Sequence, residues 1–144
     1  MSGIDGLFNG MRAAASGMTA ERARIDVVAR NIANANTTRT PEGGPYRRQL
    51  VHFAPLLSKA AGGESEVLGV RVAKVTSDDV TPLPRVLDPS HPDADAEGYV
   101  TYPNVNPVME MADLIAATRA YEANVAAQEQ FVAMVERALR LVQN

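Results

Sequence analysis

An alternating acidic segment offers the most specific chemical motif in the sequence. Asp93, Asp95 and Glu97 occupy alternate positions and Gly98 follows, as in the first half of a calcium-binding loop. The twelfth position of such a loop supplies a bidentate carboxylate, but here it is Asn104. The residues after Gly98 also read as a strand rather than as the start of a helix. We therefore predict no metal or other cofactor here.

Catalytic motifs are equally weak. His52 and His91 are the only histidines, and neither has a nucleophile at a suggestive spacing. Neither a nucleophile-elbow motif nor a glycine-rich phosphate loop occurs. The chain has no cysteine, which excludes a thiolate nucleophile, a disulfide framework and a cysteine-based zinc site. We expect a protein that is not an enzyme.

Charge and hydropathy exclude two further classes of partner. The formal net charge is −3 and no basic stripe is present, so the sequence predicts no nucleic-acid binding. No apolar run approaches the roughly 18 residues of a membrane span, which predicts no membrane insertion. The N-terminus lacks a basic region followed by an apolar stretch, and we expect no cleaved secretory signal.

Proline placement divides the chain into three parts. All nine prolines lie between Pro41 and Pro107, and proline disrupts helix interiors. We predict an α+β fold in which two long terminal helices form an antiparallel, coiled-coil-like pair around a small β-rich centre. The expected divisions are an N-terminal helix of a core domain (1–36), a β-rich and loop region (37–104), and a C-terminal helix that completes the core (105–144).

The N-terminal segment carries a seven-residue repeat that predicts an assembly seam. Two rows form it: Ile4, Met11, Met18, Ile25 and Ile32, and then Leu7, Ala14 and Val28, with Glu21 as a polar exception. Gly3, Gly10 and Gly17 repeat on a neighbouring row, either as tolerated defects or to admit a close neighbour. We expect this helix to end at Asn34–Thr38, where asparagine and threonine compete for backbone hydrogen bonds.

The C-terminal segment repeats the pattern without any glycine. Its seam comprises Met111, Val125, Val132 and Leu139 on one row, and Leu114, Tyr121, Val135 and Val142 on the other. Thr118 and Gln128 are the polar exceptions. Asn106 before Pro107 is a suitable cap, and a helix over 107–142 would be about 54 Å long. Paired helices of this length would leave one apolar side exposed, which favours assembly over a closed internal core.

The centre is predicted to contain short strands and loops. Residues 46–53 and 67–75 are the best candidate strands, and 98–102 is a weaker third. Residues 88–93 contain two prolines and read as a loop. A sheet this small is marginally stable without support.

Several motifs resemble a known family. The segment Asn31–Thr38 resembles the N-terminal signature of bacterial flagellar rod and hook proteins. Residues 43–48, 98–106 and 110–125 narrow the resemblance to the short rod proteins of its proximal part, and the match covers nearly the whole chain. Residues 58–95 depart most from the family pattern.

The resemblance implies a structural subunit of the basal-body proximal rod. Such a subunit would assemble helically with copies of itself and other rod proteins, transmit torque and form the wall of an export channel. It would pass through the flagellar type III export apparatus and reach the periplasm without a cleaved signal. The alternatives are another rod or hook axial protein, or a soluble helical-hairpin binding module.

The signature turn has two readings. Asn31, Asn34, Asn36 and Thr37 could simply stop the helix. Their side chains could also bond to neighbouring subunits, because a polar residue in a seam fixes its register. Both readings are open at the level of the sequence.

Overall fold

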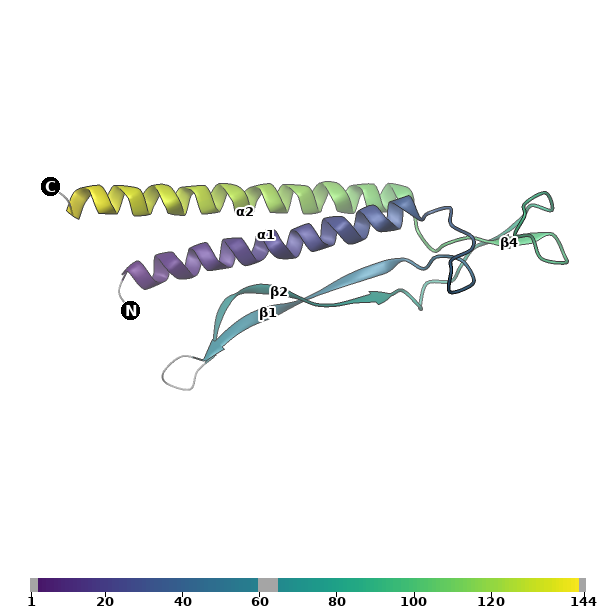
Figure 1. The fold of residues 1–144 in the computed structure, drawn as a ribbon, viewed down its shortest axis with the longest axis horizontal. Coiled ribbons are helices and arrows are strands. Elements are labelled where there is room, and N and C mark those ends of the chain that lie inside the picture. The colour runs from purple at the N-terminus through teal and green to yellow at the C-terminus, as the bar shows by residue number, and fades with distance from the viewer. Residues whose placement is uncertain (1–2, 60–64, 143–144) are drawn as a thin grey trace.

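Two antiparallel helices dominate the structure, which is a computed structural model that describes residues 3–59 and 65–142. They are α1 (Gly3–Ala33) and α2 (Pro107–Val142), and their free ends mark the N- and C-termini at the same end of the molecule (Figure 1). A two-stranded ribbon lies along α1, and a smaller pair of strands lies at the other end. The predicted α+β fold is confirmed.

The end of α1 follows from a single asparagine. The backbone N–H of Asn34 donates to the carbonyl of Arg30 at 3.1 Å, and its side-chain amide donates to the same oxygen at 2.9 Å. The hydroxyl of Thr37 then donates to the Asn34 side-chain oxygen at 3.1 Å. These bonds satisfy helix-end groups that would otherwise lack partners, and α1 stops within the predicted segment.

The start of α2 also agrees with the sequence prediction. The side-chain oxygen of Asn106 accepts hydrogen bonds from the N–H groups of Val108 (3.0 Å) and Met109 (3.3 Å). Pro107 takes the first helical position, where its missing N–H costs nothing. The helix then continues for 36 residues without glycine or proline after its first turn.

The closest contacts between the helices follow the glycine row. A methyl group built on Gly10 would lie 2.5 Å from the ring of Phe131, and one built on Gly17 would lie 2.7 Å from the amide oxygen of Asn124. Seven residues forward along α1, from Gly10 to Gly17, therefore correspond to seven residues backward along α2, from Phe131 to Asn124. The close-approach reading of the glycines is confirmed, but their partners on α2 lie outside both predicted seam rows.

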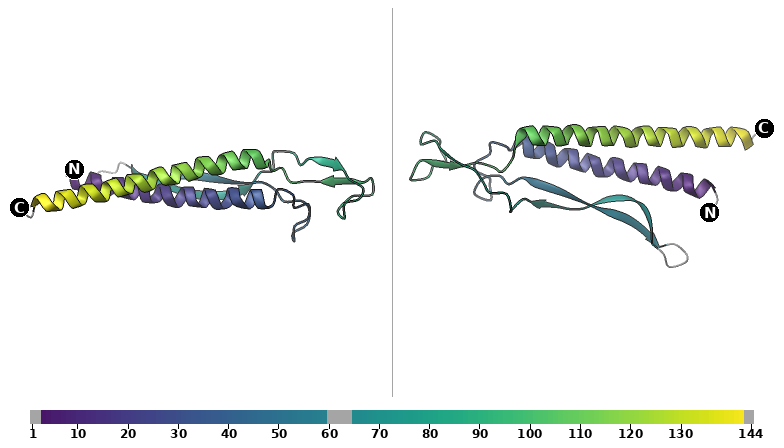
Figure 2. Two further views of the ribbon diagram at one scale, coloured as in Figure 1. Left: turned by 90° about the horizontal axis from the view of Figure 1, so that it is seen from above. Right: turned by 180° about the vertical axis from the view of Figure 1, so that it is seen from behind.

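The central ribbon consists of β1 (Gln49–Lys59) and β2 (Ser65–Ser77), which pair antiparallel. Both predicted strands exist and extend further toward the connecting loop than expected. Register shifts after His52 and after Leu56 twist the ribbon. It packs on α1 rather than on α2, and it diverges from α1 toward its far end (Figure 2).

A second, smaller sheet pairs β3 (Arg85–Leu87) with β4 (Tyr99–Thr101). The β4 strand confirms the weaker third prediction, whereas β3 lies outside the predicted strands, and its three residues are all exposed. Residues 88–93 form turns, as expected. Val100, on β4, is fully buried.

Candidate assembly interface

A buried polar junction ties together the end of α1, the start of β1 and the start of α2. Asn31 is its centre and is 1% exposed. Its amide nitrogen donates to the Gln49 carbonyl and to Glu110 Oε2, both at 2.9 Å. Its oxygen accepts from the Tyr46 hydroxyl at 2.8 Å and the Gln49 N–H at 2.9 Å. Asn31 is thus an internal tie, because all four of these amide hydrogen bonds go to partners within the chain.

Charge balance in the junction is provided by Arg48. Its Nε lies 2.6 Å from Glu110 Oε1, and its Nη2 lies 3.3 Å from a carboxylate oxygen of Asp113. Arg24, on α1, approaches the same aspartate at 3.4 Å. Glu110 is 1% exposed, and a buried carboxylate is tolerated only with such partners. The junction therefore fixes the base of the helical hairpin.

Tyr46 shows the electrostatic character of this junction. Burial raises the pKa of its hydroxyl, Arg30 lowers it and the Glu110 carboxylate raises it, with a net rise. The hydroxyl consequently stays protonated and donates to Asn31.

The other residues of the signature turn, Asn34, Asn36 and Thr37, differ in their contacts and exposure. Asn34 stops the helix, and the Thr37 carbonyl accepts from the Tyr46 N–H at 3.0 Å. Of the four residues of the signature turn only Asn36 is exposed, and its contact with a neighbouring subunit stays a prediction.

The acidic segment is used for turn formation. Asp95 accepts from the N–H groups of Glu97 (3.1 Å) and Tyr99 (2.8 Å) and pairs with Arg85 at 2.5 Å. The Tyr99 N–H is the main reason that the pKa of Asp95 lies below its usual value, with Arg85 also contributing. Asp93 instead pairs with Arg39 at 3.0 Å. Within residues 3–59 and 65–142 no cluster of His, Cys, Asp and Glu could hold a metal ion.

Both histidines have structural partners. His52 Nε2 lies 2.8 Å from the hydroxyl of Thr76 on the facing strand. His91 Nδ1 accepts from the N–H of Asp93 at 3.0 Å, and its ring meets the edge of Tyr102.

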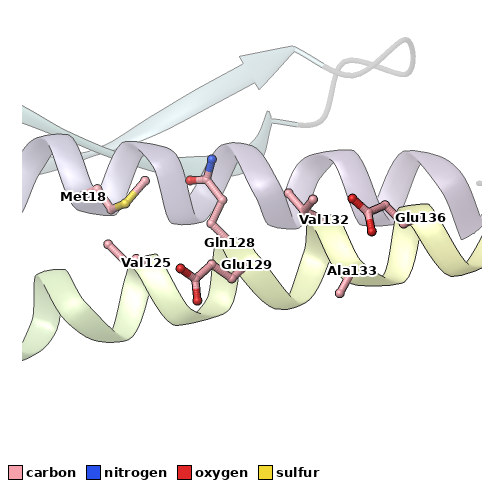
Figure 3. A pocket seen from close by; sticks show the side chains of 7 residues that line it. All are labelled: Met18, Val125, Gln128, Glu129, Val132, Ala133 and Glu136. Carbon is pink, nitrogen blue, oxygen red and sulfur yellow. The ribbon is translucent and has the colours of Figure 1, made fainter.

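The predicted seams meet along an open groove between the helices. Met18, from the N-terminal seam, lies beside Val125 from the C-terminal seam, and Val132 lines the same groove further along α2 (Figure 3). The groove has a volume of about 540 Å³, and its other lining residues are Gln128, Glu129, Ala133 and Glu136. Its walls combine apolar side chains with two glutamates, which suits a partly apolar helix from another molecule.

Exposure varies along the C-terminal seam. Met111 is 56% exposed, Val132 is 42% and Leu139 is 57%, while Leu114, Tyr121, Val125 and Val135 are half-buried. A second hollow of about 350 Å³ continues the apolar surface past Leu114 and Ile115. The side of α2 that carries Glu110 and Ala117 is thus the buried one. The residues of the predicted C-terminal seam are exposed or half-buried by comparison.

The N-terminal seam is more deeply covered. Val28 and Ala14 are buried, and Met11, Met18, Ile25 and Ile32 are half-buried. The side chains of Ile4 and Leu7, and that of Val142 on α2, lie outside the described part of the structure. Over the described residues, neither helix is long and apolar enough to cross a membrane.

A hairpin of terminal helices with an open apolar groove is the form of a subunit that assembles with others, and comparison with known proteins gives its class. Residues 11–39 match the family model "Flagella basal body rod protein", and residues 96–141 match "Flagellar basal body rod FlgEFG protein C-terminal". Both matches fall mainly on the two helices and the strands and turns that adjoin them.

Individual relatives narrow the class further. The flagellar basal-body rod protein FlgC of Borreliella burgdorferi is 44% identical, over 96% of this chain and 99% of its own length. FlgC of Bacillus subtilis is 43% identical over 93% and 97%, and FlgC of Salmonella typhimurium is 38% identical over 95% and 98%. The chain belongs to the FlgC family of flagellar basal-body rod proteins.

Proposed function

We propose that this chain is a structural subunit of the proximal rod of the bacterial flagellar basal body. The observation that carries the proposal is the groove between α1 and α2, where Met18, Val125 and Val132 remain accessible. Similarity to FlgC proteins over nearly the whole chain supports the same function. The subunit works mechanically rather than as an enzyme.

The two helices form the assembling part of the subunit. In this proposal residues 1–36 and 105–144 make up the core that packs against other rod proteins and copies of the chain, and residues 37–104 form its outer part. The seam residues of both helices contact neighbours and together build the wall of the export channel. The Asn31–Glu110–Arg48 junction keeps the two helices in register while load passes between subunits.

Torque then passes as shear over many subunit contacts. A standard protein interface buries about 800 Å² on each partner, and a subunit with several neighbours buries a multiple of this area. The rod lies in the periplasm, and the flagellar type III export apparatus delivers the chain there without a cleaved signal. The shortage of large side chains in the core fits a chain that is threaded through a channel before it assembles.

Val125→Asp tests the proposal because it places an unpaired charge in the groove. Burial of that charge on assembly is strongly unfavourable, so we expect loss of swimming and of assembled rods seen by electron microscopy. The isolated chain should keep its helicity, since Val125 is only half-buried. Val80→Asp is the matched control, because Val80 is 93% exposed and lies outside the helices. Normal swimming with Val125→Asp would contradict the proposal.

A further inference from the structure

The outer side of α1 carries three exposed arginines. Arg12, Arg22 and Arg30 are exposed, and none forms an ion pair with a side chain that the structure describes. Phe8 and Ala15 lie on the same row as Arg22, seven residues apart. At about 100° per residue this row points away from Gly17 and hence from α2. Phe8 is 52% exposed, which adds a large apolar side chain to this basic surface.

The groove side of α2 carries the opposite charge. Glu122, Glu129 and Glu136 are spaced at seven residues, and the last two line the groove (Figure 3). Glu122 borders the neighbouring hollow at Leu114 and Ile115. Glu136 approaches Arg140 at 4.0 Å, whereas Glu122 and Glu129 form no ion pair within the described part of the chain. An acidic row, in which Glu122 and Glu129 are unpaired within the described part of the chain, therefore borders the exposed apolar groove.

The two charged surfaces match when a second copy points in the same direction. Because α1 and α2 are antiparallel, the α1 of such a copy runs antiparallel to the α2 that it meets. Arg12 and Arg22 are about 15 Å apart along α1, and Glu129 and Glu122 are about 10.5 Å apart along α2. With Arg12 level with Glu129, Arg22 lies level with Arg119, about 4.5 Å past Glu122, and its long side chain must reach back over that distance to meet the carboxylate. With Arg12 beside Glu129, Phe8 falls one turn further on, beside Val132.

We propose that the groove receives the outer face of α1 from a second copy of this chain, with Arg12 beside Glu129, Arg22 toward Glu122 and Phe8 in the groove. The proposal rests on the function proposed above and names the occupant of its interface. Each copy presents a groove on one side and a basic face on another, so the contact does not close on itself. Such head-to-tail contacts generate helical arrays.

Charge reversal tests the contact in cells that depend on this chain for their flagella. Arg12→Glu and Glu129→Arg each place like charges together, and we expect about a tenfold or greater loss of assembled rods from each. The double variant restores the pair in every copy, so swimming should return. Arg71→Glu, on an exposed position of β2 outside the helical hairpin, is the matched control. Failure of the double variant to exceed both single variants would overturn the pairing.

Cross-linking identifies the occupant directly, because the natural chain has no cysteine. Isolated basal bodies that carry Arg12→Cys and Glu129→Cys in one chain should yield a ladder of covalent dimers and longer multimers after oxidation. Either single variant, or Arg12→Cys with Arg71→Cys, should yield no ladder. A cross-link from position 129 to a different protein, or no ladder in assembled rods, would overturn the proposal. The proposed function would survive that result, whereas it fails only if Val125→Asp leaves assembly intact.

Discussion

Asn31 and Glu110 are 79 residues apart in sequence, yet the amide of one donates to the carboxylate of the other at 2.9 Å. Each is 1% exposed, and together they close the base of the hairpin. Removing either partner of such a buried pair is costly, because the polar group that remains has lost its solvation and has no hydrogen bond in return. The stability of the hairpin should therefore be most sensitive at this pair.

Asn31→Ala is expected to destabilise the isolated chain by about 3 kcal/mol, because it leaves Glu110 Oε2 and the Tyr46 hydroxyl without their partner. Urea unfolding followed by circular dichroism measures the change. Glu136→Gln removes only an exposed pair with Arg140 and should change stability by less than about 0.5 kcal/mol. Equal effects of the two variants would contradict the central role of the junction.

Gly17→Ala tests the close approach of the helices. The added methyl would lie 2.7 Å from the Asn124 side-chain oxygen, and Asn124 is itself held by a 2.9 Å bond to the Ala120 carbonyl. Overpacking should lower the free energy of unfolding by about 1–3 kcal/mol, which exceeds the gain of about 1 kcal/mol from replacing a helical glycine. The Gly17→Ala variant should therefore be less stable than the natural chain.

Gly6→Ala is the matched comparison for Gly17→Ala, because nothing lies within 4 Å of the methyl it would add. The Gly6→Ala variant gains the higher helix propensity of alanine without a steric clash, so the melting temperature of this variant should rise. Thermal unfolding of both variants measures the difference. A rise for both would mean that the helices are not in close contact at Gly17.

Ser16→Ala should release the ribbon from α1. The Ser16 hydroxyl oxygen accepts the Val70 N–H at 3.0 Å, and a side chain on Gly69 would collide with that hydroxyl. Without the acceptor, the Val70 amide should exchange with deuterium about tenfold faster, which corresponds to a loss of roughly 1.4 kcal/mol. Thr19→Ala is the control, since the Thr19 hydroxyl bonds only to the Ala15 carbonyl in its own helix.

Asp78 predicts an acid-sensitive step in the loop region. The Thr81 N–H and hydroxyl and the Val80 N–H lower the pKa of this carboxyl. A carboxyl whose folded pKa is lowered stabilises the fold fully above its unfolded value of about 3.9 and loses that contribution as pH falls through the folded pKa. Stability measured against pH should therefore decline below about pH 4 more steeply in the natural chain than in Asp78→Asn. Identical slopes would show that these bonds do not stabilise the charged form.

Local signals in the sequence were sufficient to locate both helices. Asn106 and Pro107 define the start of α2, and Asn34 defines the end of α1, because caps and stops act over a few residues. The seven-residue rows correctly indicated long paired helices, and Met18, Val125 and Val132 do share one exposed groove. Their contact with neighbouring subunits stays a prediction.

Only the tertiary structure decided which row of each helix faces the other. The internal contact uses Gly10, Gly17 and Asn31 on α1 with Phe131, Asn124 and Glu110 on α2, a set with little apolar periodicity. Glycine contributes to packing by letting another side chain approach closely. A pattern of hydrophobic residues does not reveal this contribution. Likewise, the burial of Glu110 depends on Arg48 and Asn31, which approach it only when the chain has folded. Sequence periodicity thus fixes where helices form, whereas steric fit and the pairing of buried polar groups select their contact faces.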